Sequence, residues 1–140
     1  MRSSKCVHLR SGLESAGIGE QARRFDAGGH LVAFKREDGS GILRPQIAEG
    51  KAWGSLGMGF GGREFARRAQ AGGGLFLNAL MAASNGRVMP VPGGVLIRDS
   101  DGEIVGAVGI SGDTSDKDEA CAIAGIEAAG LFADPGGLKA

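Results

Sequence analysis

The chain carries few side chains that could act on a metal ion or a substrate, and they are scattered along the sequence. His8 and His30 are its only imidazoles, and Cys6 and Cys121 are its only thiols. Two histidines and two distant cysteines do not make a structural zinc site, which needs four clustered ligands. We interpret both cysteines as reduced thiols, with Cys121 inside a helix.

Four carboxylates gather near the start of a predicted helix, at Asp113, Asp116, Asp118 and Glu119. Carboxylates suit hard cations, so this acidic cluster could chelate iron or a similar ion. We favour a structural role, because Thr114 or Ser115 can cap the helix and acidic groups in the first turn complement the helix dipole. The sequence leaves both interpretations open.

Three glycines precede the same helix, at Gly106, Gly109 and Gly112. A helix N-terminus can bind phosphate, but the G-x-G-x-x-G arrangement is missing and the acidic residues would repel an anion. We therefore expect these glycines to allow close packing of a strand on a helix, or to shape a pocket wall. No serine lies in a nucleophile elbow and no cysteine–histidine pair is indicated, so no catalytic residues are predicted.

Length and charge exclude several classes of protein. The 140 residues fit one domain, and 16 basic residues balance 16 acidic ones. A net charge of zero argues against a general electrostatic grip on nucleic acid or on an anionic membrane. No run approaches 18 apolar residues, and the basic start lacks the apolar segment of a secretory signal. The cytoplasm is the expected compartment.

The first half of the chain gives mixed signals. A weak helix is predicted over Gly12–Arg24, followed by a turn at Asp26–Gly29 and a strand at His30–Arg36. Residues 44–60 have helical spacing with a proline near the start. Trp53 and Phe60 lie two helical turns apart, which favours core packing over contact with a cofactor.

The second half is clearer. Two helical segments are separated by three consecutive glycines, and a hairpin then joins two apolar strands, because Asp-Gly accepts the turn's positive φ values. A helix follows that runs to Ala129 and ends at Gly130. The predicted segments are Arg63–Ala71, Leu75–Ser84, Gly94–Arg98 and Glu103–Ser111. The pattern predicts an α+β sandwich, a small antiparallel sheet with helices on one face.

Five blocks in this order and spacing resemble the GlcG/HbpS family of haem-binding-like proteins, which also includes the C-terminal domain of PduO-type corrinoid adenosyltransferases. The blocks are Asp26–Gly39, Ile47–Ala52, Pro92–Ile97, Gly106–Gly112 and Asp116–Cys121. The resemblance covers about Asp26 to Phe132. It implies a small antiparallel sheet flanked by helices, and a homo-oligomer whose subunits build the ligand pocket together.

Because some members of that family bind haem, the resemblance makes haem a possible cofactor and His30 a candidate axial ligand. We favour the alternative, in which His30 is a strand-start residue with local hydrogen bonds. His8 is a weaker candidate, although axial ligands in this family can come from N-terminal regions.

Within the matched blocks, five residues are candidates for binding a ligand: Arg36, Lys51, Gly93, Gly94 and Asp118. Arg36 or Lys51 could pair with a haem propionate or a small organic acid, or be a solvated surface charge. The two glycines let the backbone approach a ligand or a neighbouring subunit, or simply form a turn into a strand.

The N-terminus departs from the family pattern. Relatives have an apolar strand running into the Asp26 turn, whereas residues 17–25 contain no β-branched run. We therefore assign residues 1–25 as a poorly matching segment and residues 26–140 as the family domain. If that strand is absent, one sheet edge is exposed and oligomerisation is favoured.

The leading hypothesis is a homo-oligomeric accessory protein that binds haem or another small molecule without catalysis of its own. The alternative is an enzyme, or an enzyme accessory, acting on a small organic acid of a glycolate-type pathway. There Arg36 or Lys51 would hold the carboxylate and Asp118 would move a proton. A third hypothesis is a purely structural oligomer. None of them includes a nucleic-acid or membrane partner.

Overall fold

A computed structural model describes residues 21–137, which form a five-stranded antiparallel sheet with the strand order β2-β1-β4-β3-β5. The strands are β1 (Gln21–Asp26), β2 (Leu31–Arg36), β3 (Gly94–Arg98), β4 (Ile104–Ser111) and β5 (Phe132–Asp134). The helices are α2 (Arg44–Met58), α3 (Gly62–Ala83) and α4 (Ser115–Ala128). The predicted α+β class with a small antiparallel sheet is confirmed.

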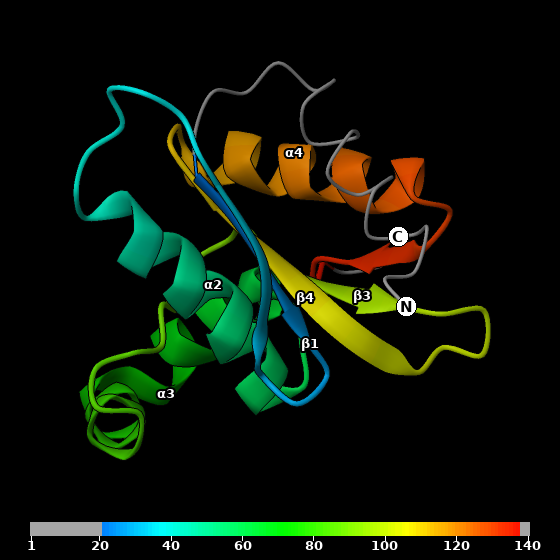
Figure 1. Cartoon of the computed structure of the whole chain (residues 1–140). Helices are drawn as coiled ribbons and strands as arrows, with labels where there is room; N and C mark the ends of the chain where they lie inside the picture. The colour runs from blue at the N-terminus through cyan, green and yellow to red at the C-terminus, as the bar shows by residue number, and fades with distance from the viewer. Residues whose placement is uncertain (1–20, 138–140) are drawn as a thin grey trace.

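The helices cover both faces of the sheet, so the prediction of helices on one face is wrong. Figure 1 shows α4 on one side of the sheet and α2 with α3 on the other. Val95, Val108 and their face of the sheet pack on α4, whereas Leu96 and Ala107 pack on α2. Strands β3 and β4 are apolar on both faces, and burying both requires a helical layer on each side.

Helix α2 lies directly on the sheet because the strands beneath it present glycines. A Cβ on Gly109 would stand 2.0 Å from the carbonyl oxygen of Ala48, and one on Gly94 would stand 2.1 Å from that of Lys51. Both distances are far below van der Waals contact, so only glycine allows this approach. The expected close strand–helix packing is confirmed at Gly109.

Strand β1 lies inside the sheet, between β2 and β4. Residues before the Asp26 turn therefore do form a strand, although they contain no β-branched run. The predicted helix is wrong over its last four residues, 21–24; the rest of that helix lies outside the described residues. Backbone pairing with two neighbouring strands and burial of Phe25 outweigh the weak strand propensity of the two arginines. Strand β1 also crosses the predicted boundary at residue 26.

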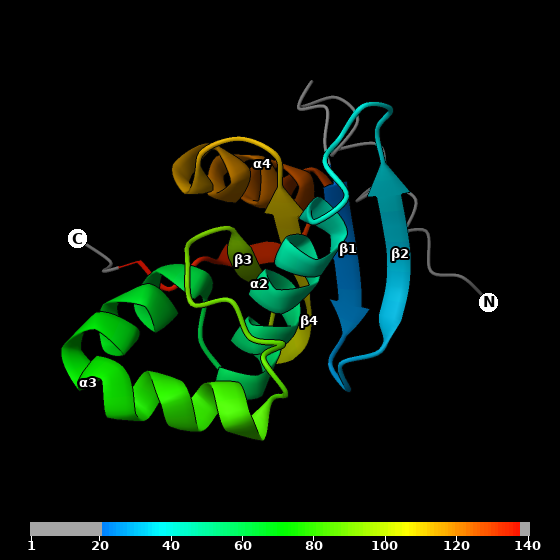
Figure 2. The same cartoon turned by 90° about the vertical axis from the view of Figure 1, so that its left-hand side faces the viewer.

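Helix α3 is kinked where the three glycines interrupt it, as predicted. Gly73 has φ 69° and ψ −169°, a conformation that essentially only glycine adopts. Figure 2 shows α3 as two segments that meet at an angle. Of its 22 residues only Gly62 and Phe65 are buried, so the second segment stands largely outside the core.

The hairpin and the last helix also match their predictions. The turn between β3 and β4 has Gly102 at φ 81°. Thr114 caps α4 by accepting a hydrogen bond from the Lys117 N–H at 3.4 Å, and the helix ends before Gly130 at φ 74°. None of the described helices is long and apolar enough to cross a membrane.

Two glycine-to-alanine variants test the contact between α2 and the sheet. Gly109→Ala should lower the free energy of unfolding by about 3 kcal/mol, because the new methyl group would overlap the α2 backbone. Gly57→Ala should raise it by about 0.5 kcal/mol, because that helical position is open and alanine favours helix. Urea unfolding measures both, and equal effects would contradict the contact.

Candidate functional site

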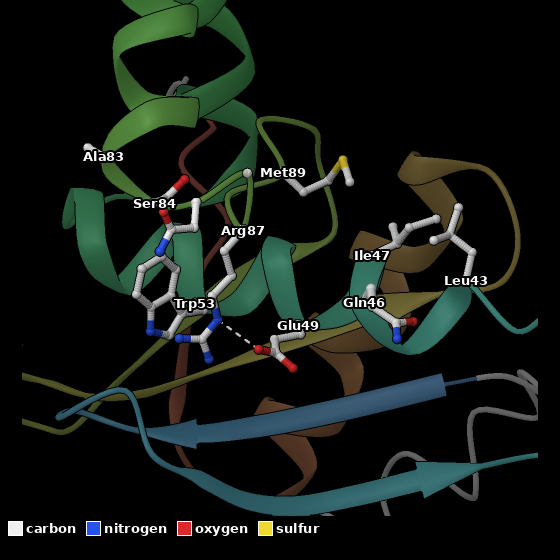
Figure 3. A pocket seen from close by; sticks show the side chains of 11 residues that line it. Leu43, Gln46, Ile47, Glu49, Trp53, Ala83, Ser84, Arg87 and Met89 are labelled. Carbon is white, nitrogen blue, oxygen red and sulfur yellow. Dashed lines mark hydrogen bonds and ion pairs between the residues drawn. The ribbon is translucent and has the colours of Figure 1, made fainter.

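A cleft of about 690 Å³ lies along the outer side of α2, facing the end of α3 and the loop to Met89. Its apolar lining includes Leu43, Ile47, Trp53 and Met89. In Figure 3 Trp53, Arg87 and Glu49 lie together at one end, and Leu43 and Ile47 lie at the other. The volume falls in the usual range for small-molecule sites.

One carboxylate at the cleft is shared by two guanidinium groups. Arg87 donates from Nε to Glu49 Oε1 at 2.7 Å, and Arg23 donates from below to Glu49 Oε2. Each guanidinium also stacks on an aromatic ring: that of Arg87 lies 4.1 Å from the centroid of Trp53, and that of Arg23 lies 4.7 Å from the centroid of Phe34. The three charged groups carry a net charge of +1.

Arg87 keeps hydrogen-bonding capacity in reserve. Its Nε bond to Glu49 is the one hydrogen bond that its side chain makes within residues 21–137, and that side chain is 38% exposed. A guanidinium offers five N–H donors, so the remaining ones can receive a ligand. An aromatic surface, apolar walls and one guanidinium suit a flat, amphiphilic molecule that carries a carboxylate.

Four of the five predicted ligand-binding residues do come together, but away from this cleft. Lys51 Nζ donates to Asp118 Oδ2 at 2.8 Å and to the Ile110 carbonyl at 3.0 Å. The two side chains are 3% and 1% exposed. Gly93 and Gly94 make room for Lys51, since a Cβ on Gly93 would lie 2.8 Å from its Nζ. The close backbone approach at these glycines is therefore to a helix of the same chain.

The remaining predicted residues lie apart from that ion pair. Arg36, at the end of β2, donates to the Ser40 carbonyl at 3.4 Å. His30 is 81% exposed, and its Nδ1 lies 3.1 Å from Asp26 Oδ1. The His30 backbone N–H donates to the same oxygen and lowers the pKa of the Asp26 carboxyl. These are local hydrogen bonds of the kind expected if His30 is a strand-start residue. His8 lies outside the described residues.

The acidic cluster is paired with basic side chains. Arg63 donates to Glu119 from Nε at 3.1 Å and to Asp116 from Nη2 at 2.7 Å. These hydrogen bonds, Glu119 first, raise the pKa of the Arg63 guanidinium. Asp118 Oδ1 accepts from the Asp113 backbone N–H at 3.0 Å. Among residues 21–137, no group of three or more histidine, cysteine or acidic side chains could hold a metal ion.

Sequence reasoning missed the residues of the cleft. Trp53, expected in the core, lies at the edge of one core cluster and also lines the cleft. Phe60 packs edge-on against Phe65, with ring centroids 6.0 Å apart. Arg87 follows an Asn-Gly turn, and no spacing in the sequence connects it with Glu49, 38 positions earlier.

Comparison with known proteins gives one family and several similar structures. The family model described as "Haem degrading protein HbpS-like" matches residues 14–127. The PduOC–haem complex is 22% identical with a TM-score of 0.82, over 94% of this chain and 96% of that one. Klebsiella pneumoniae ORFY is 22% identical with a TM-score of 0.78, over 91% and 88%. A double mutant of Streptomyces reticuli HbpS is 22% identical with a TM-score of 0.67, over 88% and 80%. No curated protein sequence matches the chain.

The buried ion pair can be tested by removing its charges one at a time. Lys51→Met should lower the free energy of unfolding by about 3–5 kcal/mol, because it leaves Asp118 buried without a counter-charge. The double variant Lys51→Met/Asp118→Asn should recover about 2 kcal/mol of that loss. Chemical denaturation measures both. A single variant as stable as the parent would show that the pair does not hold the two helical layers together.

Proposed function

This chain belongs to the HbpS-like family, and from that premise and the geometry of the cleft we propose that it binds haem beside α2. The observation that carries the proposal is that an apolar, partly aromatic cleft also contains Arg87, whose guanidinium has N–H donors that are not used within the described residues. Haem is flat and apolar except for two propionates on one edge. The residues present therefore fit its chemistry.

The chain supplies a surface for each part of the ligand. Leu43, Ile47 and Trp53 offer apolar contact for the ring, and Arg87 offers N–H donors for a propionate. Met89 brings a thioether, a group that ligates haem iron in some proteins. His30 does not line the cleft, so haem held wholly inside it is not ligated by His30 of the same chain. Bound haem would supply the iron, which the chain only holds.

The proposed role is accessory and non-catalytic, in the cytoplasm. Ser84 is the one hydroxyl among the described residues that line the cleft, and its Oγ donates to the Met81 carbonyl and accepts from the Val88 N–H, instead of pairing with a base. This supports binding rather than chemistry by the chain's own side chains. The organic-acid alternative has less support. In it Arg36 or Lys51 would hold the carboxylate and Asp118 would move a proton, but Lys51 and Asp118 neutralise each other where almost nothing is exposed.

A haem titration followed by absorbance tests the proposal. The parent should bind haem with a shifted Soret band, and Arg87→Ala should weaken binding by about tenfold, the typical worth of a charged hydrogen bond. Arg68→Ala is a matched control, because Arg68 also pairs with a glutamate and stacks on a ring, Phe60, but lies outside the cleft. The absence of a Soret shift in the parent would reject haem binding.

Further arms of the titration address the iron ligand and the chemistry. Met89→Leu preserves volume, so a spectral change with little loss of stability would assign the thioether to the iron. His30→Ala should leave the spectrum unchanged. The Soret band should also stay constant after binding. Its steady loss under a reductant would reveal haem degradation and contradict a non-catalytic role.

We also propose that the chain forms a homo-oligomer. Strand β2 lies at one end of the sheet, where Leu31, Val32 and Phe34 are 49%, 45% and 45% exposed. Such an apolar group on an outer strand favours association. Native mass spectrometry should therefore show a defined oligomer, and Val32→Lys should shift it towards the monomer. A monomeric parent at micromolar concentration would overturn this part.

A further inference from the structure

The charged groups beside the cleft have more donors than acceptors. Arg23 and Arg87 each offer five N–H groups, and the carboxylate they share belongs to Glu49 alone. Arg23 Nε is buried and has no hydrogen-bond partner. Buried donors are nearly always satisfied in folded proteins, so this orphaned donor shows that Glu49 alone does not satisfy the two guanidinium groups.

We propose that Arg87, supported by Arg23, is a binding site for the carboxylate of a ligand, and that Glu49 is its internal counter-ion. Glu49 bridges the two arginines by using one oxygen for each. A ligand carboxylate on Arg87 competes with Glu49 for the same guanidinium. Glu49 remains neutralised by Arg23, so the exchange leaves no uncompensated charge.

The position of each group supports this exchange. Arg87 and Glu49 line the cleft, with side chains 38% and 24% exposed, whereas Arg23 does not line it and is 17% exposed. The outer arginine can therefore meet a ligand while the inner one holds the glutamate. The Arg87 guanidinium lies over the Trp53 ring, and a guanidinium is suited to the planar, two-pronged recognition typical of carboxylates.

This inference rests on the proposed function only in taking haem as the molecule that carries the carboxylate. The shared chemistry is a carboxylate, which a haem propionate or a small free acid can supply. If the ligand is haem, the dimethyl ester of haem should bind less tightly than the free acid, because its propionates are neutral.

The test is Glu49→Gln, which removes the competing charge and keeps the side-chain shape. It should bind haem about five- to tenfold more tightly than the parent, and it should bind the dimethyl ester no more tightly than the parent does. Glu64→Gln is the matched control: Glu64 also bridges two arginines, Arg67 and Arg68, but does not line this cleft. It should leave haem affinity unchanged.

A second readout does not depend on haem. Trp53 is the chain's only tryptophan, so its indole N–H gives a single NMR signal beneath Arg87. Succinate should shift that signal at a lower concentration in Glu49→Gln than in the parent. If the parent ignores haem but this difference appears, the haem proposal fails and the carboxylate site stands.

Two results would overturn the carboxylate site. In the first, Glu49→Gln binds haem no more tightly than the parent does, and the parent binds the dimethyl ester as tightly as free haem. The second applies if the parent does not bind haem: the Trp53 signal then stays unmoved in the parent and in Glu49→Gln at about 10 millimolar succinate, on the order of the dissociation constant of a weak site.

Discussion

The structure depends on how closely α2 can approach the sheet. Gly94 and Gly109 remove the side chains that would stand between them, so backbone lies against backbone and small residues of α2, such as Ala52 and Ser55, face inwards. This contact fixes the rotation of the helix. Lys51 is then directed past the end of the strands to Asp118, and Glu49 and Trp53 are left on the outer side, where the cleft forms.

Two ion-pair systems consequently serve different purposes on one helix. The Lys51–Asp118 pair is almost fully buried and joins α2 to the layer on the far side of the sheet. Removing one partner of such a pair leaves the other charge buried and is strongly destabilising, whereas replacing both partners is often neutral. The Glu49 system is partly exposed and carries surplus positive charge, so it remains able to exchange partners. Burial and charge balance, more than residue type, separate the structural pair from the candidate binding site.

Much of the fold was predictable because its signals are local. The Asp-Gly hairpin, the cap at Thr114, the stop at Gly130 and the glycine break in α3 each depend on the conformational preferences of a few neighbouring residues. Strand β1 was not predictable in this way. Its residues have weak strand propensity, and only the two neighbouring strands and the burial of Phe25 make it a strand.

The sequence by itself determined the family, the α+β class, most of the helices and strands, and the close packing of a helix on a strand that the glycines allow. It also marked Arg36, Lys51, Gly93, Gly94 and Asp118 as candidates for binding a ligand, and the last four of these meet. The tertiary structure decided that this group is buried and neutral, that the helices occupy both faces, and that a cleft exists near Arg87. The reason is that burial and contacts between residues 26 or 38 positions apart arise only when the layers pack.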